Sequence, residues 1–178
     1  MKIKIISMII LALVIFSACN NTTDKTDPAK IENTEAVKVS YAPQSETLPS
    51  FKLQTTDGTI INLADLKGKK VFVNLWATWC PPCRAEIPSI EKLYKKTDKE
   101  KVAFVMLSLD DNFNSAKHFA KAKHMQLPLY YPAGNLPSLF NINGIPATFI
   151  FNEKGELIKA NMGMDDYNTD AYVKLLHS

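Results

Sequence analysis

The sequence predicts a mixed α/β sandwich, in which a central mixed β-sheet is flanked by helices and preceded by an extra N-terminal β-hairpin. Two observations lead to this prediction. In the middle of the chain, short apolar runs alternate with helical patterns, which is typical of parallel strands joined by helices. At both ends of that region, paired strand patterns surround turn residues, which is typical of antiparallel edge strands.

The first elements follow from turn signals near the start of the predicted domain, residues 47–178. Asp57-Gly58 separates two strand patterns, 51–54 and 59–62, and so predicts a hairpin. The next residues, 63–66, are predicted to form one helical turn.

The central elements follow from hydrophobic periodicity. Residues 71–77 (VFVNLWA) and 102–109 (VAFVMLSL) are apolar runs that predict buried strands. Residues 81–96 place apolar side chains at helical spacing, and 114–123 is predicted to be a second helix. Further on, a strand is predicted at 129–131 and a short helix at 136–140. An edge hairpin is predicted from 147–152 and 156–161, and a closing helix at 166–176.

The composition is that of an ordinary globular protein. Of the 178 residues, 46% are hydrophobic and 22% are charged, which supplies enough apolar side chains for a core. The formal net charge of +3 is too weak to indicate nucleic-acid binding, and we expect no nucleic-acid partner. Lys2 and Lys4 also lie in a segment that we expect to be removed, which would leave a charge of about +1.

Residues 1–18 have the layout of a secretion signal. An apolar run at 5–16, shorter than the ~20 residues that span a bilayer, is followed by small residues and Cys19. The segment from Phe16 to Cys19 resembles the lipobox of bacterial lipoproteins, although Leu is usual where Phe16 stands. We expect cleavage before Cys19 and a lipid on that residue; the alternative is an uncleaved anchor helix. Both place the rest of the chain outside the cytoplasm, held at a membrane and facing the periplasm or the cell exterior.

Residues 19–46 are predicted to be a flexible tether. They are rich in Asn, Thr, Asp, Lys, Glu and Pro and lack a sustained apolar period. The predicted organisation is therefore a lipoprotein-type signal peptide (1–18), a tether that begins with the lipidated Cys19 (19–46) and one folded domain (47–178).

Cysteine usage is sparse. Apart from Cys19, the chain has only the pair Cys80 and Cys83. A secreted protein that used disulfides for stability would usually carry more of them along the chain. This pair closes a very short loop, which constrains the unfolded chain little, so chemistry explains it better than stability does.

The pair lies between a predicted buried strand and a predicted helix, in the motif Cys80-Pro81-Pro82-Cys83. A helix N-terminus favours an anion, so we expect the pKa of the Cys80 thiol to fall from ~8.5 toward neutrality. Cys80 is then the attacking thiolate, and Cys83, one turn later, resolves the mixed disulfide. Half of a zinc site and a purely structural disulfide are the alternatives, but the histidines offer no matching second half, and we expect no metal.

The residues around this motif resemble the TlpA/ResA-like family of exported bacterial thioredoxin-fold proteins. The resemblance rests on 76–84 (WATWCPPCR), on 66–75 before it, on Glu86-Ile87-Pro88 after it and on 144–149 (GIPATF). It covers nearly all of the predicted domain. It implies a thioredoxin-like sandwich and a protein-disulfide reductase that needs no cofactor beyond a redox-active Cys80–Cys83 disulfide.

The resemblance also implies a substrate-binding surface. The Ile145–Pro146 peptide bond should be cis and lie against the cysteines, where the backbone of Ile145 can pair with an extended substrate. The alternative is a trans proline that begins a strand. Trp79 and Pro81, beside the nucleophile, are expected to join this surface, with Trp79 as an apolar rim for partners.

One position departs from the thioredoxins, which carry a buried Asp on the central strand where this chain has Asn74. TlpA/ResA-like proteins often carry a Glu shortly after the second Cys, and Glu86 fits that place. Because Glu86 lies one helical turn beyond Cys83, we hypothesise that it helps to deprotonate Cys83, with a pKa raised by partial burial. The alternative is a solvated helix carboxylate.

The leading hypothesis is a reductase for disulfides in exported proteins, re-reduced by a membrane-embedded thiol electron donor. Apocytochrome c is one substrate class that the resemblance suggests. A dithiol oxidase or isomerase would use the same cysteines in the other direction. A thiol peroxidase fits the surroundings of the reactive Cys poorly, and a redox-inactive module would only bind a partner along the Ile145-Pro146 groove.

Overall fold

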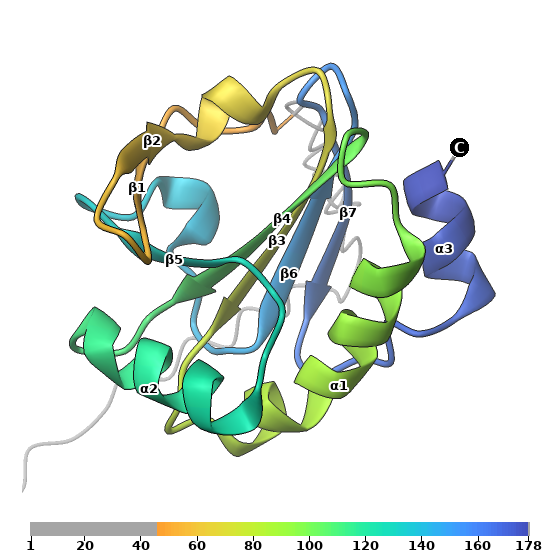
Figure 1. The fold of residues 1–178 in the computed structure, drawn as a ribbon. Helices are drawn as coiled ribbons and strands as arrows, with labels where there is room; N and C mark the ends of the chain where they lie inside the picture. The colour runs from red at the N-terminus through yellow and green to blue at the C-terminus, as the bar shows by residue number, and fades with distance from the viewer. Residues whose placement is uncertain (1–45, 178) are drawn as a thin grey trace, which may run out of the picture. The chain divides into compact units, whose positions relative to one another are not determined.

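The computed structural model describes residues 46–177 (Figure 1). The predicted signal peptide, the lipidation of Cys19 and the tether up to residue 45 lie outside the described residues. Within residues 46–177, no helix is both long enough and apolar enough to cross a bilayer.

A seven-stranded sheet forms the centre of the domain, with the strand order β2-β1-β5-β4-β3-β6-β7. β3, β4 and β5 are parallel to one another, and the other strands pair in antiparallel fashion. The predicted mixed sheet and the predicted extra N-terminal hairpin, β1–β2, are both confirmed. The strands are β1 (Lys52–Thr55), β2 (Ile60–Asn62), β3 (Lys70–Trp76), β4 (Val102–Ser108), β5 (Leu129–Pro132), β6 (Ala147–Phe151) and β7 (Leu157–Met162).

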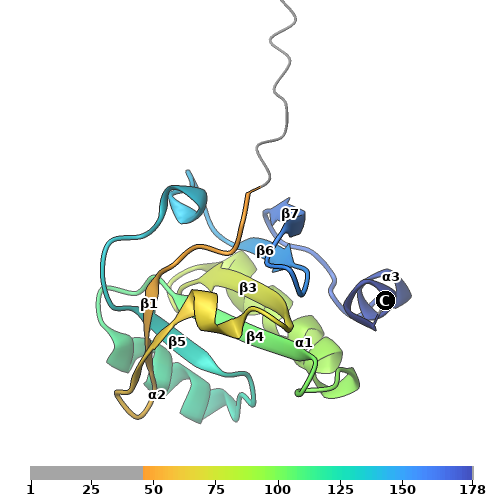
Figure 2. The same cartoon turned by 90° about the horizontal axis from the view of Figure 1, so that it is seen from above.

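Helices cover one face of this sheet, and short 3-10 turns cover the other (Figure 2). The helices are α1 (Pro81–Lys96), α2 (Phe113–Lys123) and α3 (Asp170–His177), and the turns are η1 (Leu63–Leu66) and η2 (Ser138–Phe140). Along β3, Phe72 and Trp76 face the helices, whereas Val71, Val73 and Leu75 face the 3-10 turns on the other side. Asn74 therefore shares the helix-facing side of β3 with two aromatic side chains.

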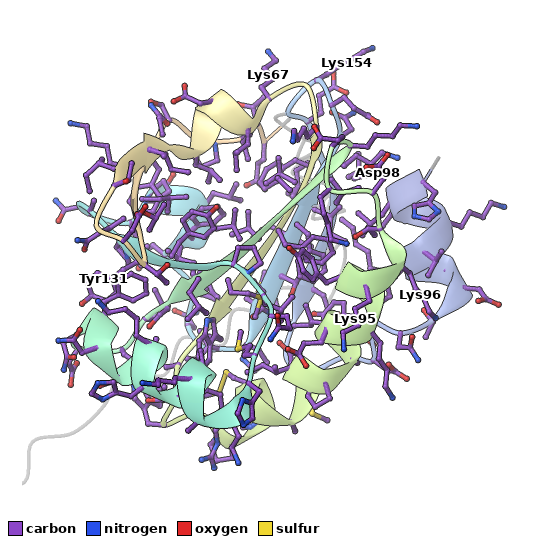
Figure 3. The ribbon with its side chains drawn as sticks, viewed as in Figure 1. Lys67, Lys95, Lys96, Asp98, Tyr131 and Lys154 are labelled. Carbon is purple, nitrogen blue, oxygen red and sulfur yellow. A yellow bond between two sulfur atoms is a disulfide. The ribbon has the colours of Figure 1, made fainter. Side chains whose placement is uncertain are left out.

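Apart from Lys70, Glu86 and Asp110, the charged side chains of residues 46–177 lie at or near the surface. Lys67, Lys95 and Lys154 are exposed and point away from the sheet (Figure 3). β3 is buried at every position, as its apolar sequence predicts. The polar group Asn74 in this strand is fully buried and therefore needs partners inside the core.

Several helix boundaries differ from the sequence prediction, among them the start of η2, which is at Ser138 rather than 136, and the starts of α2 and α3. α2 begins one residue earlier than predicted, at Phe113, because Asn112 caps it by accepting a hydrogen bond from Ser115 N. α3 begins at Asp170 rather than at 166. The carboxylates of Asp165 and Asp166 accept hydrogen bonds from nearby backbone N–H groups, and such local bonds compete with helix formation.

Candidate functional site

Cys80 lies at the junction between β3 and α1 and is the N-cap of that helix. Pro81 and Pro82 have no N–H, so the first N–H that α1 offers is that of Cys83, and it donates to Cys80 Sγ at 3.2 Å. The Cys80 and Cys83 sulfurs form a disulfide, with their Cα atoms 5.3 Å apart. A thiolate on Cys80 would accept the same N–H and be stabilised by the helix dipole, as the sequence predicts.

The turn that presents Cys80 is held by a buried carboxylate from the end of β4. Asp110 Oδ1 accepts hydrogen bonds from the N–H of Thr78 at 3.1 Å and from its hydroxyl at 2.6 Å. Asp110 Oδ2 accepts a further bond from Ser108 Oγ at 2.8 Å. Because Thr78 lies two residues before the nucleophile, these bonds fix the direction in which Trp79 and Cys80 leave the strand.

The predicted cis-proline loop lies against the disulfide. The Ile145–Pro146 peptide bond is cis, as predicted, and the Ile145 carbonyl oxygen is 3.7 Å from Cys80 Sγ. Two hollows, of about 470 and 620 Å³, share residues 141–145 in their lining. Trp79 lines the first, and Met162 lines the second together with Pro146. In the described chain, no charged residue lines either hollow.

Two of the exposed apolar side chains, Trp79 and Met162, line the hollows at this site. Among residues 46–177 the large exposed hydrophobic side chains are Ile60, Trp79, Ile158, Met162 and Met164. Trp79 is 64% exposed and directly precedes the nucleophile, and its role as a rim for partners stays a prediction. Trp76, two residues beyond Asn74 on β3, is fully buried and belongs to the core instead.

Glu86 is enclosed by protein rather than solvated, because only 2% of it is exposed. Its Oε1 accepts a hydrogen bond from Asn74 Nδ2 at 2.8 Å, and its Oε2 accepts one from the backbone N–H of Asp165 at 3.2 Å. Burial raises the pKa of Glu86 to about 7, although the two hydrogen bonds favour the charged form and lower it. The structure therefore places a carboxyl that titrates near neutral pH one helical turn beyond Cys83.

A buried network that the sequence did not reveal supports Glu86. Asn74 Nδ2 also donates to Thr148 Oγ1 at 2.9 Å, and Tyr167 Oη donates to the same oxygen at 2.7 Å. Burial raises the pKa of Tyr167 above its usual range, so it remains a neutral donor. Only one signal in the sequence pointed to this network, namely an amide in the middle of a buried strand.

Comparison with known proteins decides what this arrangement is. The model of the Redoxin family matches residues 43–176, which is most of the chain. The chain belongs to the Redoxin family. Its relatives include the thiol-disulfide oxidoreductase ResA of Halalkalibacterium halodurans, with 30% identity over 77% of this chain and 79% of that protein. They also include the thioredoxin-like protein YneN of Bacillus subtilis, with 35% identity over 67% of this chain and 72% of that protein.

A solved structure agrees with these relatives. The thiol:disulfide interchange protein of the thioredoxin family from Chlorobium tepidum has a TM-score of 0.65 and 30% identity, over 76% of this chain and 98% of that one. The predicted thioredoxin-like fold is thereby confirmed. The Redoxin-family chain is a TlpA/ResA-like thiol–disulfide oxidoreductase, and its substrates are disulfide-containing proteins. Cys80 and Cys83 are the pair that this structure offers for the reaction.

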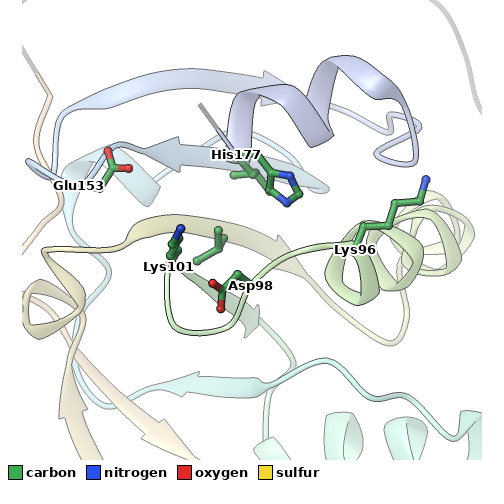
Figure 4. A pocket seen from close by; sticks show the side chains of 7 residues that line it. Lys96, Asp98, Lys101, Glu153 and His177 are labelled. Carbon is green, nitrogen blue, oxygen red and sulfur yellow. The ribbon is translucent and has the colours of Figure 1, made fainter.

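A third hollow, of about 510 Å³, lies at the other end of the Redoxin domain (Figure 4). It mixes cationic and anionic side chains, and its lining includes Lys96, Asp98, Lys101, Glu153 and His177. Lys96 is the last residue of α1, whereas the disulfide is at the first turn of that 16-residue helix. At 1.5 Å per residue the two ends are roughly 20 Å apart, so this hollow takes no part in the thiol chemistry.

Proposed function

We propose that this enzyme reduces disulfides of exported proteins in the cell envelope, held at a membrane by a lipid on Cys19. The observation that carries the proposal is that Cys83 is fully buried, one helical turn from a buried carboxyl whose pKa is about 7. A reductase needs a base for its second, resolving thiol, and we assign that role to Glu86. The membrane attachment rests on the signal-like residues 1–18 and on Cys19 alone.

The reaction begins with the reduced pair. The Cys80 thiolate attacks one sulfur of the substrate disulfide, a Cys80–substrate disulfide forms, and the other substrate sulfur leaves as a thiolate that takes up a proton. Cys83 then gives its proton to the Glu86 carboxylate and attacks Cys80 Sγ. The second substrate thiolate leaves, and the enzyme is left with the Cys80–Cys83 disulfide. Two electrons have passed to the substrate.

The order of attack follows from exposure and position. Cys80 is 3% exposed and its sulfur lies beside Ile145, which lines both hollows, whereas Cys83 is fully buried. A substrate sulfur can therefore approach Cys80 but not Cys83. The Cys83 N–H that now points at Cys80 Sγ would stabilise the same sulfur as the thiolate that attacks the substrate.

Substrate binding is assigned to the surface around the cis-proline loop. An extended segment next to the substrate disulfide would lie along Ile145 and Pro146, with Trp79 and Pro81 as its apolar border. The two uncharged hollows beside Ile145 favour apolar or neutral side chains next to the substrate cysteine. Apocytochrome c, with two closely spaced cysteines, is one candidate substrate.

The pair needs no further cofactor in this proposal, but it needs electrons. We assign their supply to a membrane-embedded thiol donor, which would reduce the Cys80–Cys83 disulfide by the same exchange run in reverse. A lipid on Cys19 would keep the domain near such a donor.

The proposal is tested by trapping in cells. With Cys83→Ala in the full-length chain, the first mixed disulfide cannot be resolved, and Cys80-dependent adducts with exported proteins should accumulate. The double variant that also carries Cys80→Ala is the matched control and should trap nothing. Equal recovery of partners by both variants would indicate a redox-inactive binding module instead. A reduction potential near that of a strong oxidant, measured against glutathione, would favour a dithiol oxidase.

A further inference from the structure

Glu86 is closed off from water by a loop whose residues had no assigned role. This loop, residues 163–169, joins β7 to α3 and is called the β7–α3 loop below. Its Asp165 donates a backbone N–H to Glu86 Oε2 at 3.2 Å. On the opposite side, Asn74 from β3 donates to Oε1. The carboxyl of Glu86 therefore has one described hydrogen-bond partner on each oxygen, and one of the two comes from this loop.

The loop is held in place by side chains from three other elements. Tyr167 N donates to Ser89 Oγ of α1 at 3.1 Å, and Tyr167 Oη donates to Thr148 of β6. The carboxylate of Asp165 accepts a bond from Tyr172 Oη of α3 at 2.5 Å. Asp165 is half-buried, so its charge is only partly screened by solvent. Its position next to Glu86 is thus fixed through both its backbone and its side chain.

The groups that face Glu86 can be named for each element around it. The loop contributes Asp165 and Tyr167, and α3 contributes Tyr172; Cys83, one turn away on α1, is held in the disulfide and does not titrate in this form. β3 and β6 contribute an amide and a hydroxyl, which do not titrate. Burial raises the pKa of both tyrosines above their usual range, so they stay neutral. Among these neighbours, Asp165 is the one that carries a carboxylate.

We propose that Asp165 is a positioning residue for Glu86: its N–H holds the Glu86 carboxylate in place, while its own carboxylate opposes the ionisation of Glu86. The inference rests on the proposed role of Glu86 as the base for Cys83. The two effects have opposite signs, since a hydrogen bond to the charged form lowers the pKa of Glu86 and a neighbouring negative charge raises it. The carboxylate of Asp165 thus makes Glu86 a stronger base for the Cys83 proton.

Asp165→Asn separates the two effects, because it keeps the backbone N–H and the size of the side chain but removes the charge. The experiment follows the carboxyl carbon of Glu86 by ¹³C NMR in the full-length, oxidised chain, with its signal assigned by its absence in Glu86→Gln. We expect the inflection in Asp165→Asn to move to lower pH by roughly half a unit or more. Asp166→Asn, the same change at the next residue, is the matched control and should leave the inflection in place.

Two results would overturn the inference: an unchanged inflection in Asp165→Asn, or an equal shift in Asp166→Asn. Tyr172→Phe gives a second test that leaves the loop backbone untouched. Without the tyrosine hydroxyl, the Asp165 carboxylate keeps only the N–H of Asp166 and can move toward water, so a smaller shift in the same direction is expected. An inflection that moves to higher pH in Tyr172→Phe would also contradict the proposal.

The failure of this inference can be told apart from the failure of the proposed function. The pH profile for reduction of a synthetic disulfide peptide is measured for wild type, Glu86→Gln and Asp165→Asn. A wild-type profile in Glu86→Gln would remove Glu86 from the mechanism, whatever Asp165 does. If Glu86→Gln loses the inflection and Asp165→Asn keeps it at the wild-type pH, only the role of Asp165 is refuted.

Discussion

The buried carboxyl of Glu86 should make the oxidised enzyme less stable as the pH rises, and Glu86→Gln should remove that dependence. The pKa of Glu86 is about 7 in the folded chain, against an ordinary value of 4.5. Below pH 4.5 the carboxyl is protonated in both the folded and the unfolded chain. Between pH 4.5 and 7 only the unfolded chain releases the proton. Above pH 7 the folded chain carries the full penalty of a buried charge.

The size of this penalty follows from the two pKa values. One unit of pKa corresponds to about 1.4 kcal/mol, so the difference between the folded and unfolded values is worth about 3 kcal/mol. The free energy of unfolding of Glu86→Gln, minus that of wild type, should therefore rise by about 3 kcal/mol from pH 4.5 to pH 8. A constant offset of roughly 1 kcal/mol against the variant is also expected, because the Gln NH₂ cannot accept the N–H of Asp165.

Urea unfolding of the oxidised proteins at several pH values between 4.5 and 8 measures this difference, and groups common to both proteins cancel. Glu100→Gln, which removes an exposed carboxylate just after α1, is the matched control and reports the effect of losing a surface charge. A difference between Glu86→Gln and wild type that stays constant over this range would refute the reasoning. So would a difference that falls with rising pH, since that is the sign of a carboxylate stabilised by folding.

Three further variants test the rest of the site. Asn74→Ala removes the side-chain donor to Glu86 Oε1, so the Glu86 inflection in the pH profile of activity should move to higher pH. Movement to lower pH would mean that the Asn74 bond does not lower the pKa of Glu86. Trp79→Ala should raise KM for a protein disulfide about five- to tenfold and leave the reduction potential unchanged. A changed potential would show that Trp79 acts on the disulfide itself. Thr78→Val removes the hydroxyl donor to the buried Asp110 carboxylate and should lower the free energy of unfolding by about 1–3 kcal/mol. An unchanged free energy in urea unfolding would show that this bond does not hold the turn.

The parts of the site that sequence reasoning could predict are those set by neighbours in the chain. Cys80 at the start of α1 follows from an apolar strand pattern, two prolines and helical spacing, all within about 25 residues. The cis bond before Pro146 was expected only from the family resemblance, because a single X–Pro pair does not reveal its isomer. The position of Glu86 one turn beyond Cys83 is a helix property, but its burial is not.

The parts that could not be predicted depend on contacts between distant segments. Asn74 and Thr148 are 74 residues apart in the chain, and Asp165 and Glu86 are 79 apart. Periodicity reports which face a residue is on, not which polar group lies opposite. Residues 166–169 carried enough helical pattern to be predicted as the start of α3. Their side-chain bonds instead fold them into the loop that covers Glu86.

The energetics of Glu86 bear directly on its role. A carboxyl kept only to satisfy Asn74 and the N–H of Asp165 would not need to ionise, and a neutral side chain of the same size would avoid the penalty of about 3 kcal/mol above pH 7. Folded proteins have only about 5–15 kcal/mol of net stability, so this is a large fraction to give up for structure alone. Ionisation near neutral pH is, however, what a base for Cys83 requires. The pH dependence of stability and that of the resolving step should therefore share one inflection, and both should disappear together in Glu86→Gln.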